Sequence, residues 1–454
     1  MPARTSSGTS SGASHGNSLR VAVLADSDTR WKWGALTARR IVGKSGPGDS
    51  GESGAPGGTG ACAVTGFLLR GRATPTARQL GEVGGEFAAP REVTGAEFIA
   101  AMGREADAYD VIVLALVGGS VQALLHGLAR LWPGPSRRPV LVTGYVGVVY
   151  EKLADGLLLR HGADLVLANS PHDEGRFREV YEGVGADASA VTGARLPFLG
   201  GAPYGGVADA VVFAAQPSVP EKRADRAYLL RRLVEHARLY PGREVVLKLR
   251  SKPGEHTTHV EELPYQRLVQ DLPVAPPPNF RLAYGHMGEV LDRAGLLVTV
   301  SSTAALESLH RRIPTAVLTD LGVREPLGNH HFLGSGCLTS WDRLDAGHRP
   351  TADAQWLVRH GVVTQNDPYE AVREKIADLR GRPELPSPAP FYTPESATGY
   401  LPGILARHRL DEAPPARVTG VRRVVRDAVR DAARGAYRHG VQRVAPVIRR
   451  MGEL

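Results

Sequence analysis

The sequence predicts an α/β protein built from two doubly wound, Rossmann-like domains, and three observations support this fold class. Apolar strand-like runs alternate with helical patterns along residues 19–382, which is typical of mostly parallel sheets. The length of 454 residues exceeds the usual size of one domain. A glycine-rich break at residues 200–206 is followed by a second series of the same alternation.

The first predicted domain covers residues 19–200. Residues 1–18 are expected to form a disordered leader, because they are rich in Ser and Gly and lack the apolar segment of a secretory signal. A Gly/Ser/Pro stretch at residues 43–60 is expected to form a surface loop. The expected strands are residues 19–25, 63–69, 111–116, 139–142 and 165–168, and the expected helices are residues 31–41, 95–102, 121–131, 150–161 and 171–181.

An uncharged run at residues 111–129 approaches the length of a bilayer crossing. Gly118-Gly119-Ser120 divides this run in the middle. We therefore expect a short strand followed by an amphipathic helix with Ser120 as its N-cap, and not a membrane span.

The second predicted domain covers residues 207–382. Its expected strands are residues 210–214, 244–249, 296–300 and 315–318, and its expected helices are residues 223–239, 287–294 and 303–311. Residues 383–454 are expected to form a proline-rich linker and then a basic amphipathic helix, since apolar residues recur at helical spacing between arginines after residue 415.

The positive charge is concentrated in this C-terminal tail. The chain has 55 Lys and Arg against 47 Asp and Glu, a formal net charge of +8. We favour docking of the basic helix on the protein's own surface. Attachment to an anionic inner-membrane surface is the next alternative, and binding to nucleic acid or to a partner is the least favoured.

Composition limits the remaining classes. The hydrophobic content of 42% is that of a globular protein. Cys62 and Cys337 are the only cysteines, which excludes a disulfide framework and fits a reducing cytoplasm. No metal-ligand spacing is apparent, so we expect neither a metal site nor a cofactor.

A strand that runs directly into Ser301-Ser302-Thr303 is the strongest candidate for a binding site. A helix pattern follows it, and a helix start offers free backbone N–H groups to an anion, to which the hydroxyls add donors. Its place at the carboxyl end of a strand favours ligand binding, although an ordinary helix cap is the alternative. Glu307, on the same helix, is a candidate for binding a ribose diol. The alternative is that Glu307 is a plain surface residue.

The loop after residues 245–249 is dense in cations and imidazoles. Lys248 and Arg250 alternate onto one face, where they are candidates for neutralising a diphosphate leaving group; a solvated basic loop is the alternative. Glu255, His256 and His259 follow as candidate cleft-lining residues. Two histidines on an irregular loop are a weak metal signal, so no metal is assigned to them.

Carboxylates follow the first strand of the first domain. Asp26 and Asp28 are the candidate general bases for an acceptor hydroxyl, with helix capping by Asp28 as the alternative. Gly144, Tyr145 and Ser170 also follow strands of this domain, and Asn329 lies on a loop of the second. These are further candidate cleft-lining residues, although the glycine is also explained by a tight turn.

The arrangement resembles the GT-B class of glycosyltransferases, in which two doubly wound domains face each other and the second holds most of the nucleotide donor. The segment V-T-V-S-S-T-A-A-L-E at residues 298–307 resembles the donor-phosphate turn of capsule-type enzymes, including Kdo transferases, polysialyltransferases and polyol-phosphate transferases. Those enzymes often carry His-Pro after the strand that corresponds to residues 245–249. This chain has Arg250-Ser251 instead, so the donor is left open.

The sequence is more closely similar to an uncharacterised bacterial family of predicted glycosyltransferases over residues 19–345. The similarity is carried by A-D-S-D at residues 25–28, G-Y-V-G-V-V-Y-E-K at 144–152 and K-L-R-S-K-P-G-E-H-T-T-H at 248–259, together with the segment at 298–307. It implies transfer of a sugar, or of a polyol phosphate, from a nucleotide-activated donor.

The expected function is therefore a metal-independent, cytoplasmic glycosyltransferase of GT-B architecture. Its partners would be a nucleotide-activated sugar and a glycan or lipid acceptor of the cell envelope, and it would act on the inner face of the membrane if the tail attaches there. Two alternatives stay open at this point. One is an enzyme like a nucleotide-sugar 2-epimerase, and the other is a non-catalytic nucleotide-binding or scaffold protein.

Overall fold

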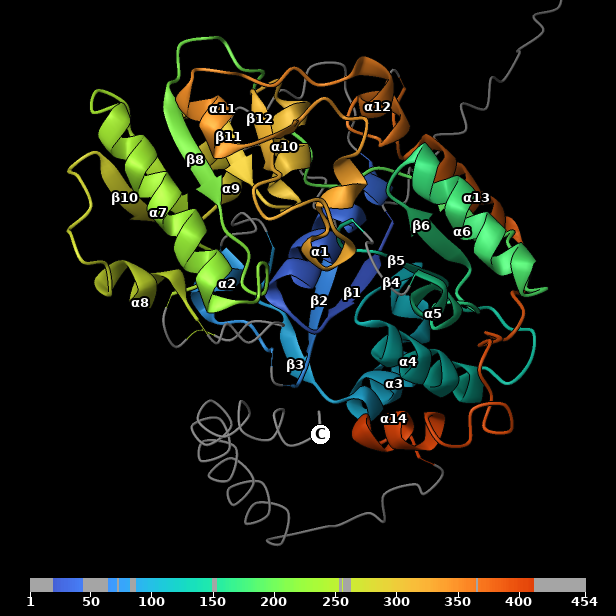
Figure 1. The fold of residues 1–454 in the computed structure, drawn as a ribbon. Coiled ribbons are helices and arrows are strands. Elements are labelled where there is room, and N and C mark those ends of the chain that lie inside the picture. The colour runs from blue at the N-terminus through green and yellow to red at the C-terminus, as the bar shows by residue number, and fades with distance from the viewer. Residues whose placement is uncertain are drawn as a thin grey trace, which may run out of the picture.

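The computed structural model describes residues 19–43, 64–71, 73–81, 87–148, 153–252, 255, 263–364 and 366–411. These residues form two parallel β-sheets that lie in separate lobes, each flanked by helices (Figure 1). The prediction of two Rossmann-like domains is confirmed. Of the tail, residues 412–454 fall outside the described part, and so does the predicted basic helix.

The first sheet has seven described strands in the order β3-β2-β1-β4-β5-β6-β7, and every neighbouring pair is parallel. The central strand β1 lies between β2 and β4, so that Val23 pairs with Gly66 on one side and with Val113 on the other. The strands are β1 Val21–Ala25, β2 Val64–Leu69, β3 Arg91–Val93, β4 Val111–Ala115, β5 Val140–Gly144, β6 Leu165–Ala168 and β7 Val191–Gly193.

Helices cover both faces of this sheet because its central strands are apolar on both faces, as parallel sheets require. Gly34 permits a close approach of α1 to the sheet, since a Cβ there would lie 2.7 Å from Val23 and 2.9 Å from Ala115. The helices are α1 Asp28–Val42, α2 Ala77–Gly81, α3 Gly95–Arg104, α4 Gly118–Leu131, α5 Leu153–Leu158 and α6 Pro171–Gly183, with the 3-10 turn η1 Ala106–Ala108.

The uncharged run at residues 111–129 forms β4 and most of α4, as expected. The helix begins earlier than predicted, at Gly118 with Val117 as its N-cap, so Ser120 is not the cap. Within the described part of the chain, no helix combines the length and the apolar character that a membrane crossing needs.

The second sheet has six described strands in the order β10-β9-β8-β11-β12-β13, and its neighbours are again parallel. Its strands are β8 Ala210–Ala214, β9 Val245–Lys248, β10 Phe280–Ala283, β11 Ala294–Thr299, β12 Thr315–Leu318 and β13 Leu338–Thr339. Its helices are α7 Arg223–Leu239, α8 Tyr265–Gln270, α9 Met287–Leu291, α10 Ala304–His310, α11 Trp341–Asp345 and α12 Ala354–Arg359, with the 3-10 turns η2 Glu325–Leu327 and η3 Asn329–Phe332.

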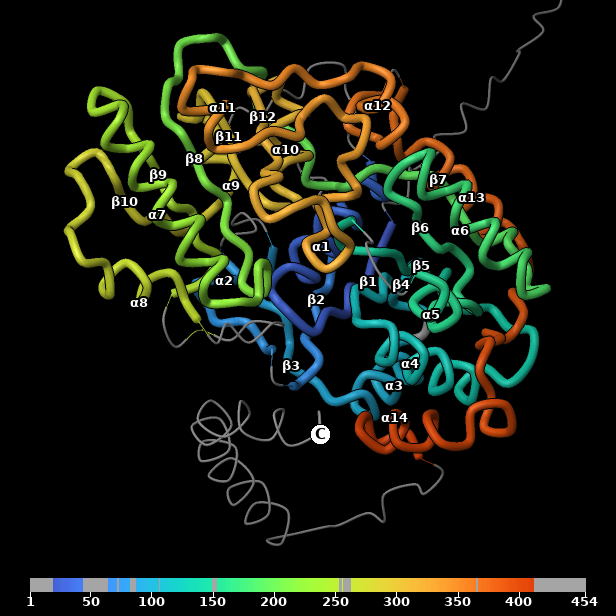
Figure 2. Tube along the Cα trace, viewed as in Figure 1, coloured from blue at the N-terminus to red at the C-terminus, as the bar shows by residue number. Residues whose placement is uncertain are grey.

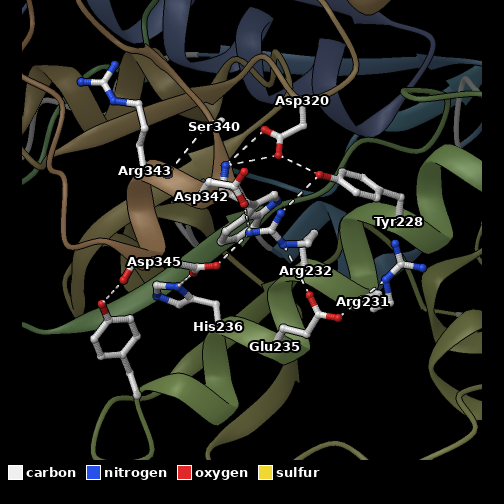
Figure 3. A network of polar contacts seen from close by, with 12 residues as sticks. Tyr228, Arg231, Arg232, Glu235, His236, Asp320, Ser340, Asp342, Arg343 and Asp345 are labelled. Carbon is white, nitrogen blue, oxygen red and sulfur yellow. Dashed lines mark hydrogen bonds and ion pairs between the residues drawn. The ribbon is translucent and has the colours of Figure 1, made fainter.

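A polar network fixes α7 against α11 and the end of β12 (Figure 3). Arg232 donates to Asp345 at 2.8 Å, and the buried His236 lies 2.6 Å from the other oxygen of the same carboxylate. Asp320, just after β12, accepts from the Tyr228 hydroxyl at 3.0 Å and from the Trp341 backbone N–H at 3.2 Å. These contacts hold one flank of the second domain rigid.

After α12 the chain returns to the first domain. Helix α13 Glu370–Gly381 places Val372, Ile376 and Leu379 in the core beside the first sheet. The segment then passes along the first domain to α14 Leu401–Arg407, which packs against α4 (Figures 1 and 2). From the sequence, α13 was expected in the second domain and residues 383–411 in a linker. In the structure, both segments pack against the first domain.

Candidate active site

The candidate site lies where the carboxyl ends of the two sheets face each other. In a doubly wound sheet, ligands bind at the point where the strand order reverses, which here lies between β1 and β4 and between β8 and β11. Asp26 follows β1 and accepts a hydrogen bond from the Val117 backbone N–H, 3.0 Å away, at the start of α4. It also forms an ion pair with Arg30, at 3.0 Å.

The corresponding position in the second domain holds an uncharged side chain. Gln216 follows β8, and its Oε1 accepts from the Ser301 backbone N–H at 3.0 Å. The amide nitrogen of the same side chain donates a hydrogen bond to the Ser301 hydroxyl at 3.2 Å. Gln216 therefore ties the end of β8 to the turn that follows β11.

The Ser301-Ser302-Thr303 turn uses part of its hydrogen-bonding capacity internally. Ser301 is buried, and its hydroxyl donates to the Leu327 carbonyl at 2.5 Å. Ser302 accepts from the Ala304 backbone N–H at 3.2 Å, which leaves the Ser302 hydroxyl proton for another acceptor. The Ser301-Ser302-Thr303 turn thus joins β11 to α10, with Ser301 holding it together and with Ser302 and Thr303 half-buried.

Arg250 reaches across the domain interface to the start of α1. Its Nη2 donates to Asp28 Oδ1 at 2.6 Å, and its guanidinium also bonds the Thr29 hydroxyl. The Arg250 and Asp28 side chains are 27% and 17% exposed, so the pair is only partly screened by water. A predicted donor-site cation and a predicted base therefore neutralise each other in this structure. Helix α1 begins at Asp28, and the N-cap is Ser27.

Lys248 lies two residues before Arg250, and it is buried at the end of β9. Its Nζ donates to the Leu249 carbonyl at 2.8 Å. Its charge acts on two titratable residues of the second domain: burial raises the pKa of Glu307, which the Lys248 charge opposes, and burial lowers the pKa of His286, to which the Lys248 charge adds. The side chain therefore supplies positive charge to the interior of the site.

The loop after β5, which contains Gly147, lies against the Ser301-Ser302-Thr303 turn. A Cβ on Gly147 would lie 3.1 Å from the Thr303 hydroxyl. Asn169 holds this loop by donating to the Tyr145 carbonyl at 2.8 Å and to the Gly147 carbonyl at 3.2 Å. The first domain thus presents a backbone edge directly to the predicted donor turn.

Glu307 is a buried carboxyl group at the domain interface. Burial raises its pKa, while Lys32, Arg311 and Lys248 act in the opposite direction. Lys32 lies on α1 of the first domain, so cations from both domains surround this carboxyl group. The expectation of a plain surface glutamate does not hold, because only 8% of the residue is exposed.

Most of the other predicted cleft residues have structural contacts. Gly144 accepts from Arg160 at 3.0 Å through its carbonyl, and the same guanidinium lies 4.0 Å from the centre of the Tyr145 ring. Ser170 caps α6 by accepting from the Asp173 backbone N–H at 3.0 Å. Asn329 is fully buried and bridges two loop carbonyls within its own domain.

Glu255 joins the two domains, since it forms an ion pair with Arg78 on α2 and accepts from the Lys252 backbone N–H at 2.8 Å. His256 and His259 lie outside the described residues. Among the residues that the structure describes, no cluster of three or more His, Cys, Asp or Glu side chains is arranged to hold a metal ion.

Sequence reasoning missed Lys32, Gln216, His286 and Arg311. His286 follows β10, a short strand that was not predicted, and burial lowers the pKa of its imidazole. The rule that carboxyl ends of parallel strands carry ligand residues identifies Gln216 and His286 once β8 and β10 are both recognised. Arg311 donates to the Gly200 carbonyl at 2.9 Å, a contact that no sequence signal indicates.

Several solved structures are similar to this chain at low identity. The S. aureus MnaA–UDP structure has 11% identity and a TM-score of 0.46, over 79% of this chain and 95% of that one. The UDP-GlcNAc 2-epimerase from Neisseria meningitidis bound to UDP-GlcNAc has 10% identity and a TM-score of 0.43, over 80% and 98%. The lipopolysaccharide outer core galactosyltransferase WaaB has 11% identity and a TM-score of 0.37, over 80% and 96%. At these values the likenesses say nothing about the reaction.

The sequence itself gives the more informative comparison. Among curated proteins no significant sequence match is found. The model of the family described as "Putative glycosyltransferase (DUF6716)" matches residues 21–379. This match covers more than half of the chain and includes the ends of β1, β9 and β11 that form the candidate site. The chain therefore belongs to this glycosyltransferase family.

Proposed function

We propose that the protein transfers a sugar, or a polyol phosphate, from a nucleotide-activated donor to a hydroxyl group of a cell-envelope glycan or lipid. The observation that carries this proposal is the contact of Arg250 with Asp28 across the domain interface. It brings a cation from the end of β9 to a carboxylate at the start of α1. Glycosyl transfer needs both kinds of group, one at the leaving phosphate and one at the attacking hydroxyl.

The leaving group would be stabilised by the second domain. Lys248 and Arg250 supply positive charge, and the Ser302 and Thr303 hydroxyls supply donors beside the Gly147 loop. As the bond between the sugar and the diphosphate breaks, the bonding electrons pass to the diphosphate oxygen, where these cations offset the new charge. We propose that they do so without a metal ion.

The acceptor would be activated by Asp28 rather than Asp26. Asp26 is committed to Arg30 and to the backbone of Val117, whereas the partner of Asp28 is the Arg250 guanidinium that faces the donor side. A donor diphosphate carries more negative charge than one carboxylate, so it competes with Asp28 for Arg250. Donor binding then frees Asp28 to take the proton of the acceptor hydroxyl as the new bond forms.

Glu307 would bind the donor's ribose diol. Its carboxyl group is buried near Lys32, Lys248 and Arg311, which keep positive charge close to it. A group so placed accepts hydrogen bonds from two adjacent hydroxyls without strong competition from water. Attachment of the tail to an anionic membrane surface would bring the site near lipid acceptors, and this part of the proposal rests on residues outside the described range.

The first experiment identifies the donor. Thermal-shift measurements against CMP-, CDP-, UDP- and GDP-linked sugars and polyols should show one nucleotide class that raises the melting temperature, because a ligand that binds the folded state stabilises it. With that donor, Arg250→Ala and Ser302→Ala should weaken nucleotide binding and lower turnover, while Arg343→Ala on the exposed face of α11 should change neither. Unchanged affinity and turnover in both site variants would refute the proposal.

Product analysis separates transfer from isomerisation. Transfer predicts that the labelled sugar appears on an acceptor and that free nucleotide accumulates in equal amount. Conversion of the donor to an isomer without any acceptor would show an epimerase instead, and tight binding without turnover across an acceptor panel would show a non-catalytic protein.

A further inference from the structure

A cavity of about 320 Å³ lies between the two domains, apart from the phosphate turn. Helix α6 lines it from the first domain, while η3 and α12 line it from the second. Its lining residues are His172, Arg176, His330, His331, Leu333, Trp356, Arg359 and His360. None of these residues belongs to the proposed donor or base groups, so the cavity is a separate feature.

The lining is rich in cations and imidazoles, and none of its described residues is acidic. Burial together with the charges of neighbouring groups lowers the pKa of His331 to about 3 and that of His360 to about 4. The rings lie close together, since the ring centres of His172 and His331 are each 4.8 Å from that of His360, the first ring tilted against it and the second edge-on to it. The imidazoles are therefore neutral at ordinary pH, while Arg176 and Arg359 keep their positive charge and attract an anion to the cavity.

The contacts within the cavity show where an anion would bind. Arg359 lies 3.2 Å from His172 Nδ1, and since a guanidinium can only donate, this ring nitrogen is the acceptor and carries no proton. The Nδ1 atom of His360 is buried and has no hydrogen-bond partner among the described residues. An anion between these groups would accept hydrogen bonds from the Arg359 guanidinium and from the N–H groups of the imidazoles.

We propose that this cavity is a second anion site, which binds a phosphate monoester between the two domains. Arginine forks match the geometry of phosphate oxygens. The volume is that of a small-molecule site and exceeds what a bare ion fills. A smaller neighbouring hollow shares His331 and His360 and reaches Gly147, so the site adjoins the acceptor side of the cleft.

Binding at this site is coupled to protonation. An anion near the imidazoles raises their pKa values, so the complex takes up protons that the empty cavity does not hold. By linkage, affinity increases as the pH falls, by about tenfold per pH unit for each proton taken up. The charged and titratable groups that line the cavity are His172 and Arg176 from α6, His330 and His331 from η3, Arg359 from α12 and His360 just after it. Asp173 and Glu179 of α6 are not part of the lining, but their charges act on His172.

The test uses isothermal titration calorimetry of the full-length protein with three probes. The affinities for inorganic phosphate and for a short alkyl phosphate, both measured at constant pH, distinguish a free-phosphate site from a monoester site. The proposal requires that the ester binds more tightly. Sulfate, whose charge is constant, is titrated between about pH 7 and pH 5, which is the side toward the lowered pKa values of His331 and His360. Its affinity is expected to rise as the pH falls.

Arg359→Gln is the decisive variant, because Arg359 is exposed and its loss leaves the core intact. It is expected to weaken binding of all three probes by at least about tenfold, whereas the matched Arg343→Gln should bind like the parent protein. Equal weakening in both variants, or binding of Zn²⁺ in place of anions, would overturn the proposal. Because no step needs turnover or nucleotide, and because Arg359 is none of the proposed donor-binding groups, a loss of phosphate binding in Arg359→Gln is independent of the proposed transferase activity.

Discussion

Replacing Asp28 by Asn is expected to cause two separate losses, one in stability and one in turnover. The ion pair with Arg250 spans 2.6 Å and joins side chains that are 17% and 27% exposed, so it lies between a surface pair and a buried pair. Its coupling energy should therefore be about 1 kcal/mol. If Asp28 is the general base, the same change should also lower turnover by about 10²–10⁴-fold.

A double-mutant cycle with Asp28→Asn, Arg250→Gln and the double variant, measured by urea denaturation, isolates the coupling energy. Turnover is measured as release of nucleotide from the donor identified by thermal shift. Asp271→Asn is the control, because Asp271 also pairs with an arginine, Arg223 at 3.0 Å, but far from the interface and about half exposed. Full turnover in Asp28→Asn together with loss of turnover in Asp26→Asn would refute the choice of base.

Three further predictions concern groups around the site. Asp345→Ala should lower the free energy of unfolding by about 2–3 kcal/mol, since it removes charged partners from Arg232 and the buried His236; Asp342→Ala, at an 83% exposed side chain, should cost less than about 0.5 kcal/mol in the same urea titration. Burial raises the pKa of Glu307, so folding is penalised above that pKa and the penalty vanishes as the pH falls below the unfolded value. Glu307→Gln should therefore raise the melting temperature at neutral pH and leave it unchanged near about pH 4. The control Glu289→Gln, at an exposed residue, should change the melting temperature at neither pH. A lowered melting temperature of Glu307→Gln at neutral pH would contradict this reasoning. Gly162→Ala should destabilise the fold by about 1–3 kcal/mol more than Gly185→Ala. Both glycines have positive φ, but only a Cβ at residue 162 would clash with the Ala389 backbone, at 2.6 Å. Equal melting temperatures of the two variants would show that the C-terminal segment does not pack against Gly162.

The sequence predicted the two sheets because long apolar strands such as β4 and β11 carry their own signal. It missed β3, β7, β10 and β13, because short strands derive their stability from their neighbours and not from a pattern of their own. The return of α13 to the first domain was also missed. Its apolar positions show that one face is buried but not which domain covers that face.

The candidate site was predictable to the extent that strand ends carry ligands. That rule placed the Ser301–Thr303 turn, Arg250 and Asp28 at strand ends, and in the structure Arg250 contacts Asp28 while the Gly147 loop lies against Thr303. It did not distinguish residues that face the cleft from residues that stabilise loops, and Asn329 proves to be one of the latter. The direct pairing of Arg250 with Asp28 joins residues more than two hundred positions apart, and only the docking of the two domains determines it.

The two switch points explain why the donor phosphates are assigned to the second domain. In the first domain, the carboxylate of Asp26 occupies the start of α4, where it accepts from the Val117 backbone N–H and would repel a phosphate. In the second domain, the equivalent contact is made by neutral Gln216, with the Lys248 charge close by. From these charges we expect the same backbone geometry to disfavour an anion in the first domain and to favour one in the second. Asp26→Asn should remove this difference, so that the variant binds pyrophosphate at the first domain's switch point while Gln216→Glu weakens nucleotide binding at the second. If neither substitution shifts anion binding, measured by calorimetry, the charge at the switch point does not determine which domain holds the donor.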